Sequence, residues 1–236
     1  MWNLLIKKPL TLLLILLIFQ NKIMAQSKPK LIYFGDPMCS WCYGFSPEIS
    51  EAIDSLGEEI DFQLIMGGLR PYNTETMIDL SGFLKNHWEE VSKQTGQPFS
   101  YEILKDKKFV YDTEPACRAV VLMRELKPES EFDFFKKIQN QFYLKNKNTN
   151  LPETYAELAQ EYGYNKIDFA QRFNSDELKE RVKKDFTYSQ NIGVRSFPTV
   201  FLKKGDDLYL IVQGYDKAEA IIQKSRKIIG TKKVKQ

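Results

Sequence analysis

Apolar positions near residue 30 follow first the pattern of a strand and then that of an amphipathic helix. Residues 31–34, Leu-Ile-Tyr-Phe, form a short apolar run that is typical of a strand. Residues 60–66 repeat the strand pattern and end at a glycine pair. Between the two runs, apolar side chains recur at helical spacing until Gly57, a helix-ending residue: Phe45, Ile49, Ala52, Ile53 and Leu56. Residues 30–68 therefore predict a strand–helix–strand unit.

The middle of the chain, from about residue 71 to 191, loses its strand signals and becomes helical. A capping pattern of Asn-x-x-Glu, from Asn174 to Glu177, predicts the start of one helix. The aromatic stripes of this region are expected to pack in a core rather than to hold a cofactor. Three further helices are expected around residues 113–123, 135–142 and 152–162.

Strand signals return near the carboxyl end. Residues 199–202 and 208–212 flank Gly205-Asp206-Asp207, which predicts a hairpin. A closing helix is expected over residues 217–229. The predicted order is βαβ, a helical block and then ββα, so the expected fold class is α/β.

Residues 1–25 have the features of a secretory signal. Lys7 and Lys8 form a basic start, residues 10–19 are apolar, and Ala25 is a suitable last residue before cleavage. The apolar run of about ten residues is too short to span a bilayer as a helix. We expect a cleavable signal peptide and a periplasmic or secreted protein, with an uncleaved membrane anchor as the alternative.

The formal net charge of +3 comes from this amino-terminal segment, which holds three lysines and no acid. The remaining chain has equal numbers of basic and acidic side chains, so its charge does not indicate a nucleic-acid partner. Residues 231–236 form a short basic tail, which we expect to be a solvated terminus.

The motif Cys39-Ser40-Trp41-Cys42 lies where the first predicted strand gives way to the helix. Unpaired N–H groups and the helix dipole at a helix N-terminus favour a thiolate. A thiolate attacks disulfides, and a second cysteine one turn later can resolve the mixed disulfide. The motif therefore predicts a redox centre, with an inert structural disulfide as the alternative.

A metal site is not expected in this chain. Zinc would need two more soft ligands, and the sequence offers only Cys117 and its single histidine, His87. Both are far from the cysteine pair in sequence. No metal and no cofactor is therefore predicted.

Residues 36–45, Asp-Pro-Met-Cys-Ser-Trp-Cys-Tyr-Gly-Phe, resemble the active-site segment of FrnE-like members of the DsbA family, in the thioredoxin superfamily. The resemblance extends to residues 66–70 and 111–118. It implies a thioredoxin fold with a helical domain inserted between its two halves. In those terms, the thioredoxin-like domain comprises residues 26–70 and 192–230, and the inserted helical domain comprises residues 71–191.

The resemblance also assigns expected roles to particular residues. Cys39 is the exposed nucleophile, and Cys42 resolves the mixed disulfide. Residues 193–199 resemble the loop that carries a cis-proline, so Pro198 and Phe197 are expected to hold the backbone of a substrate beside Cys39. Trp41 is expected either to tune the thiol and contact substrate or to shield the disulfide.

Three further positions allow more than one interpretation. Asp36 matches an acid of some FrnE-like sequences, and either assists proton transfer or caps the helix. Thioredoxins bury an acid six residues before the first cysteine, but here that position is Tyr33, so the proton acceptor for Cys42 stays open. Cys117 is either a buried free thiol or a neighbour of the redox pair.

The implied function is an exported thiol–disulfide oxidoreductase. Its expected partners are cysteine-containing exported proteins and a redox partner, either a quinone-linked membrane oxidase or a thiol reductase. Because Ser-Trp replaces the histidine found between the cysteines of strong oxidants, we expect a less oxidising pair than that of DsbA. The direction of electron flow stays open. Two alternatives are a glutathione-dependent isomerase or transferase and a non-catalytic peptide-binding module with a static disulfide.

Overall fold

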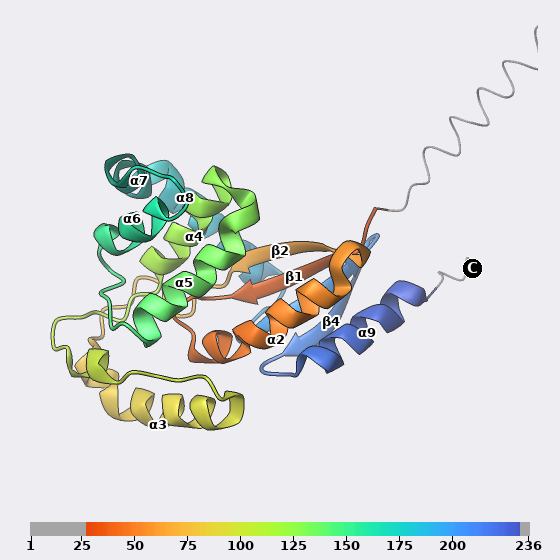
Figure 1. Ribbon diagram of the computed structural model, residues 1–236, viewed down its shortest axis with the longest axis horizontal. Helices are drawn as coiled ribbons and strands as arrows, with labels where there is room; N and C mark the ends of the chain where they lie inside the picture. The colour runs from red at the N-terminus through yellow and green to blue at the C-terminus, as the bar shows by residue number, and fades with distance from the viewer. Residues whose placement is uncertain (1–26, 232–236) are drawn as a thin grey trace, which may run out of the picture.

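The computed structural model of the chain describes residues 27–231. Its centre is a four-stranded mixed sheet with strand order β2-β1-β3-β4 (Figure 1). The central strand β1 runs parallel to β2 and antiparallel to β3. The strands are β1 (Lys30–Gly35), β2 (Asp61–Met66), β3 (Thr199–Lys204) and β4 (Asp207–Gln213).

Strand β1 is buried on both faces, which explains its continuous apolar run. Leu31 and Tyr33 belong to the main core, whereas Ile32 and Phe34 point to a smaller cluster that includes Ile65. This alternation follows from the two-residue period of a strand. The first strand therefore lies between two apolar layers.

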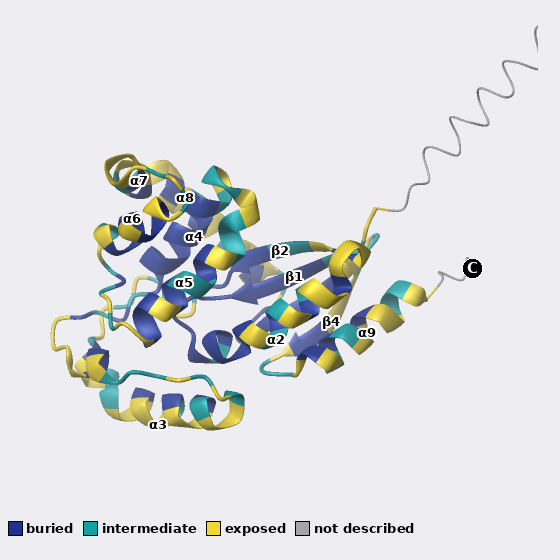
Figure 2. Cartoon of the chain, viewed as in Figure 1, coloured by how far each residue is buried: buried dark blue, intermediate teal, exposed yellow. Residues whose placement is uncertain are grey.

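Helix α2 (Ser40–Leu56) follows β1, and it packs beside α9 (Ala218–Gly230) on one face of the sheet (Figure 1). Each of these helices buries one side and exposes the other, as Figure 2 shows. The amino-terminal end of α2 contacts α3 through Trp41 and His87, and α5 through Tyr43 and Tyr143. The end of α2 that carries the cysteine pair is thus covered by helices from the middle of the chain.

The segment between β2 and β3 is helical, as the apolar spacing predicts. Two of its helices, α3 and α7, were not foreseen from the sequence. The helices are α3 (Met77–Thr95), α4 (Glu114–Leu126), α5 (Glu131–Tyr143), α6 (Pro152–Gln160), α7 (Lys166–Phe173) and α8 (Asp176–Asn191). Short 3-10 turns are η1 (Gly57–Glu59), η2 (Glu102–Lys105) and η3 (Pro128–Ser130).

The predicted cap of α8 was wrong by one residue. The N-cap is Ser175, whose Oγ accepts a hydrogen bond from the N–H of Leu178 at 3.3 Å. Asn174 instead ends α7, because its N–H donates to the carbonyl of Ala170. Asn174, which the sequence pattern assigned to the start of α8, is therefore the C-cap of α7, a helix that was not predicted.

The edge of β2 is covered by side chains. The Arg124 guanidinium donates to the Leu64 carbonyl at 2.9 Å, and a carboxylate oxygen of Asp185 accepts from the Met66 N–H at 2.9 Å. Arg124 and Asp185 also form an ion pair with each other at 2.8 Å. Side chains of α4 and α8 thus form hydrogen bonds with the backbone groups of β2 that face away from β1.

The α/β fold with a helical segment between the βαβ and ββα halves is the fold class that the sequence predicts. Within residues 27–231, no helix is both long enough and apolar enough to cross a membrane. The predicted signal peptide, residues 1–25, lies outside the described residues, as does the basic tail beyond its first residue.

Candidate active site

The cysteine pair lies at the junction of β1 and α2, where the sequence predicts it. Cys39 is the N-cap residue of α2, and its carbonyl accepts the N–H of Tyr43 at 2.9 Å. The first turn of α2 contains no acidic residue. Cys39 therefore lies at a helix end of the kind whose free N–H groups and dipole favour negative charge.

Cys39 is not exposed, contrary to the expectation from the sequence. Only 4% of its surface is accessible, because the loop before β3 covers it. Its Sγ lies 3.6 Å from the carbonyl oxygen of Phe197 and donates a hydrogen bond to it. The covering residue is 158 positions away in sequence, so no local pattern could reveal it.

Cys42 lies one turn deeper and is fully buried. Burial raises the pKa of the Cys42 thiol well above its ordinary value, and the hydrogen bond with Cys39 raises it further. Both cysteines are free thiols in the structure. The two sulfurs thus occupy different environments, one at a helix end beside a loop carbonyl and the other inside the core.

The loop that faces Cys39 contains a cis peptide bond between Phe197 and Pro198, as predicted. The Pro198 carbonyl accepts the N–H of Gly214 at 2.8 Å. A Cβ at Gly67 would overlap the Phe197 ring, so a glycine is required there for the loop to sit in this place. The substrate-holding roles of Phe197 and Pro198 stay predictions.

Trp41 is half-buried and begins a row of aromatic side chains. Its ring lies edge-on to the His87 ring, with 6.0 Å between the ring centroids, and its centroid is 6.2 Å from that of Tyr215. His87 in turn stacks on Phe83 at 5.6 Å, and Phe83 is 66% exposed. Helix α3 therefore extends the aromatic surface that starts at the redox motif. The sequence analysis missed this contact because it missed α3.

Asp36 is fully buried and does not cap α2. Its Oδ1 accepts from the Met38 N–H at 2.8 Å, and its Oδ2 accepts from the Leu69 N–H at 2.7 Å. Burial raises the pKa of this carboxyl despite these bonds. Asp36 thus joins the loop of the cysteine pair to the loop after β2, and a role in proton transfer stays a prediction.

Cys117 is a buried free thiol that reaches the redox loop through Asp36. Its Sγ lies 3.4 Å from Oδ2 of Asp36 and donates to it. Burial raises the pKa of the Cys117 thiol well above its ordinary value. The prediction of a buried free thiol is confirmed. The thiol contacts Asp36 of the motif segment, and a place beside the cysteine pair itself stays a prediction.

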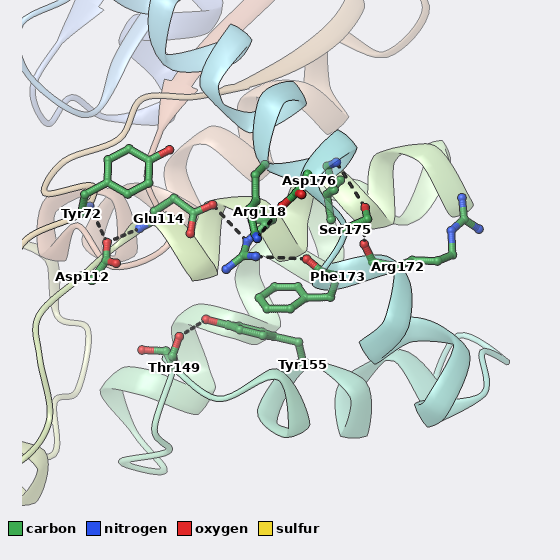
Figure 3. A network of polar contacts seen from close by, with 12 residues as sticks. Tyr72, Asp112, Glu114, Arg118, Thr149, Tyr155, Arg172, Phe173, Ser175 and Asp176 are labelled. Atoms are coloured by element: carbon green, nitrogen blue, oxygen red, sulfur yellow. Dashed lines mark hydrogen bonds and ion pairs between the residues drawn. The ribbon is translucent and has the colours of Figure 1, made fainter.

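The turn of α4 that carries this thiol is fixed by a network of polar contacts (Figure 3). Asp112 Oδ1 accepts from the N–H groups of Tyr72 and Glu114, at 2.7 and 2.9 Å. The Arg118 guanidinium pairs with Glu114 at 3.0 Å and donates to the Phe173 carbonyl at 3.1 Å. The network holds the amino-terminal turn of α4 against α7.

Met38, the residue before Cys39, is held by the helical segment. Its carbonyl oxygen accepts hydrogen bonds from the hydroxyls of Tyr111, at 2.6 Å, and Tyr143, at 2.7 Å. Its Sδ accepts from the Thr149 hydroxyl at 3.3 Å. We call the two hydroxyls of Tyr111 and Tyr143 on this carbonyl the clamp on Met38. The sequence did not reveal it, because the two tyrosines are 73 and 105 residues from Met38.

Metal ligation is not supported by side-chain clustering in the described part of the chain. Among residues 27–231, no three His, Cys, Asp or Glu side chains are grouped so that they could hold an ion. The arrangement instead suits chemistry between two sulfurs: a thiol at a helix N-terminus and a second, buried thiol one turn away.

Comparisons with known proteins agree with this geometry. The thioredoxin family matches residues 33–223. A candidate protein disulfide isomerase from Nitrosomonas europaea is 37% identical, with a TM-score of 0.76, over 84% of this chain and 95% of that one. The cytosolic disulfide reductase DsbM from Pseudomonas aeruginosa is 26% identical, with a TM-score of 0.67, over 85% and 95%.

More distant structures share the fold alone. A probable DsbA oxidoreductase from Streptomyces coelicolor is 13% identical, with a TM-score of 0.67, over 88% of this chain and 93% of that one. No protein with a curated description matches the sequence. The FrnE-like branch stays a prediction, but the chain belongs to the thioredoxin family, and its fold is the one found in DsbA oxidoreductases.

Proposed function

We propose that the protein is an exported oxidoreductase that exchanges disulfides with cysteine-containing proteins through Cys39 and Cys42. The observation that carries the proposal is the placement of the two sulfurs. Cys39 lies at the N-cap of α2 beside the Phe197 carbonyl, and Cys42 is buried behind it. This arrangement supports Cys39 as the thiol that reacts first and Cys42 as the thiol that reacts second.

The exchange takes place in two successive thiol–disulfide exchange steps. The Cys39 thiolate attacks a substrate disulfide, a bond forms between Cys39 and one substrate sulfur, and the other substrate sulfur leaves as a thiolate. The Cys42 sulfur then attacks Cys39, and the remaining substrate sulfur leaves with the electron pair and takes up the proton from Cys42. The reverse sequence transfers the disulfide to a substrate.

The cover over Cys39 supports a substrate that docks against the loop before β3 as its disulfide reaches the sulfur. A bound chain would lie along the loop of Phe197 and Pro198, where backbone groups can pair with an extended segment. The exposed ring of Phe83, linked to Trp41 through His87, supports an apolar contact with the same substrate.

Export and the redox partner belong to the same proposal. The basic start and the apolar run within residues 1–25 support a cleavable signal peptide and a periplasmic or secreted location. The partner is a quinone-linked membrane oxidase or a thiol reductase. The Ser40-Trp41 pair supports a potential below the roughly −120 mV of DsbA. Sequencing the amino terminus of the protein purified from the exported fraction tests the location.

The activity is tested by equilibrating the protein in glutathione buffers and following Trp41 fluorescence, with Cys117→Ala as the control background. We expect a reversible transition between dithiol and disulfide. A Cys42→Ser variant should trap a mixed disulfide at Cys39. A protein that shows neither exchange nor trapping carries a static disulfide and is not an oxidoreductase.

A further inference from the structure

Tyr33 places a hydroxyl group deep in the core beside the redox pair. The residue lies in the middle of β1 and is fully buried. Its ring packs edge-on against Phe45 of α2 and Phe135 of α5, at 5.8 and 5.9 Å. Its hydroxyl also lies over Gly35, and a Cβ added at Gly35 would be 2.8 Å from the hydroxyl oxygen. A phenylalanine would fill the same apolar space without burying a hydroxyl.

That hydroxyl has no hydrogen-bond partner of ordinary geometry among the described residues. A buried polar group without a partner is costly, so its presence calls for a function. The Cys42 thiol lies close enough to this hydroxyl to interact with it. Burial raises the pKa of Tyr33 well above its ordinary value, and charge on Cys42 raises it further. In turn, the Tyr33 hydroxyl lowers the pKa of Cys42 against the effect of burial.

Other titratable groups near Cys42 are less suited to stabilise its thiolate. Cys39 raises the pKa of Cys42, and Tyr143 of α5 uses its hydroxyl on the Met38 carbonyl. The carboxylate oxygens of Asp36 accept hydrogen bonds from other groups and carry no donor when ionised. Tyr33 is therefore the side chain placed to donate to Cys42.

We propose that the Tyr33 hydroxyl donates a hydrogen bond to the Cys42 sulfur as its charge develops, and thereby sets the rate at which Cys42 resolves the mixed disulfide. The inference rests on the proposed function. In the resolving step, a bond forms between Cys42 and Cys39, the bond from Cys39 to the substrate sulfur breaks, and the proton of Cys42 passes to the departing sulfur. Tyr33 keeps its own proton throughout, so it is a positioning residue and not the base.

The test is Tyr33→Phe in a Cys117→Ala background. The reduced protein is mixed with glutathione disulfide, quenched in acid, and assayed by mass spectrometry for the mixed disulfide at Cys39. We expect the first attack to proceed at the unsubstituted rate and the resolving step to slow about tenfold. The pH profile of resolution should also move up by about one unit, because a hydrogen bond to a charged group contributes on this scale.

Tyr164→Phe is the matched control, because it removes a tyrosine hydroxyl that donates to the Leu126 carbonyl, outside the site. The Tyr164→Phe variant should resolve the mixed disulfide at the same rate as the unsubstituted protein. If Tyr33→Phe also leaves the resolution rate and its pH profile unchanged while the unsubstituted protein exchanges normally, Tyr33 has no such role and the proposed function stands.

A second measurement does not depend on turnover. In a Cys39→Ser, Cys117→Ala background, Cys42 is the remaining thiol and can be titrated by its ultraviolet absorbance. Adding Tyr33→Phe should raise the pKa of Cys42, and an unchanged titration overturns the inference. If the unsubstituted protein forms no mixed disulfide but the titration shifts, the proposed function fails while the contact between Tyr33 and Cys42 is upheld.

Discussion

The clamp on Met38 allows a quantitative prediction about how the helical segment supports the redox loop. Two hydroxyls, from Tyr111 and Tyr143, donate to the same carbonyl oxygen. Among the described residues, no other donor is placed on that oxygen. Met38 itself is fully buried, so water cannot replace a lost partner.

Replacing either tyrosine with phenylalanine should cost about 1 kcal/mol, the net contribution of one buried hydrogen bond. The carbonyl would keep one partner in each single variant, and the rings would keep their packing. In the double variant, the carbonyl would have none, which adds about 1–3 kcal/mol for an unsatisfied buried group. Tyr111→Phe with Tyr143→Phe should therefore lower the free energy of unfolding by about 3–5 kcal/mol, more than the sum of the single changes.

The measurement is a double-mutant cycle by urea unfolding, followed by circular dichroism, with the dependence on denaturant checked for constancy. Tyr164→Phe gives the effect of losing a single hydroxyl–carbonyl bond elsewhere. Strictly additive single and double effects would refute the reasoning, because they would mean that the two hydroxyls do not share one oxygen.

Three further predictions concern the site and its support. Gly67→Ala should lower the free energy of unfolding by about 1–3 kcal/mol and slow exchange at Cys39, because its Cβ overlaps Phe197; unchanged urea unfolding and glutathione exchange would contradict this. Burial alone would raise the pKa of Glu48, but hydrogen bonds from residues 215–218 lower it. The contribution of Glu48 to the free energy of unfolding is therefore present above its unfolded pKa of about 4.3. It is lost as pH falls through the pKa of Glu48 in the folded protein. Glu48→Gln should cost up to about 1 kcal/mol at neutral pH and nothing in acid; a difference that is the same at every pH would count against the assignment. Finally, Cys117 should resist alkylation in the folded protein and react on unfolding, which peptide mapping can follow; rapid native labelling would show that it is accessible.

Local patterns predicted the parts of the fold that depend on neighbours in sequence. The apolar run of β1, the helical spacing after Cys39 and the start of that helix all lie within about 25 residues, and each was foreseen. Helix α3 was detectable in principle, because four buried side chains recur along it at helical spacing: Met77, Leu84, Trp88 and Val91. Gly82 and several polar residues between them weakened the pattern.

The contacts that define the site are different in kind. The cover over Cys39 comes from Phe197, and the clamp on Met38 comes from Tyr111 and Tyr143. Each joins residues more than 70 positions apart, so only the tertiary fold brings them together. The expectation of an exposed nucleophile failed for this reason, since exposure depends on what packs over a residue and not on its neighbours along the chain.

The covered edge of β2 has a consequence for the proposed exchange with other proteins. Exposed strand edges recruit extended segments of other proteins and lead to aggregation. Here the Leu64 carbonyl and the Met66 N–H already bond to Arg124 and Asp185, so an incoming strand finds these groups occupied. An extended segment of another protein is thereby kept from pairing with these two groups of β2. Under the proposed function, a client protein can therefore exchange its disulfide without adding a strand at this edge of the sheet.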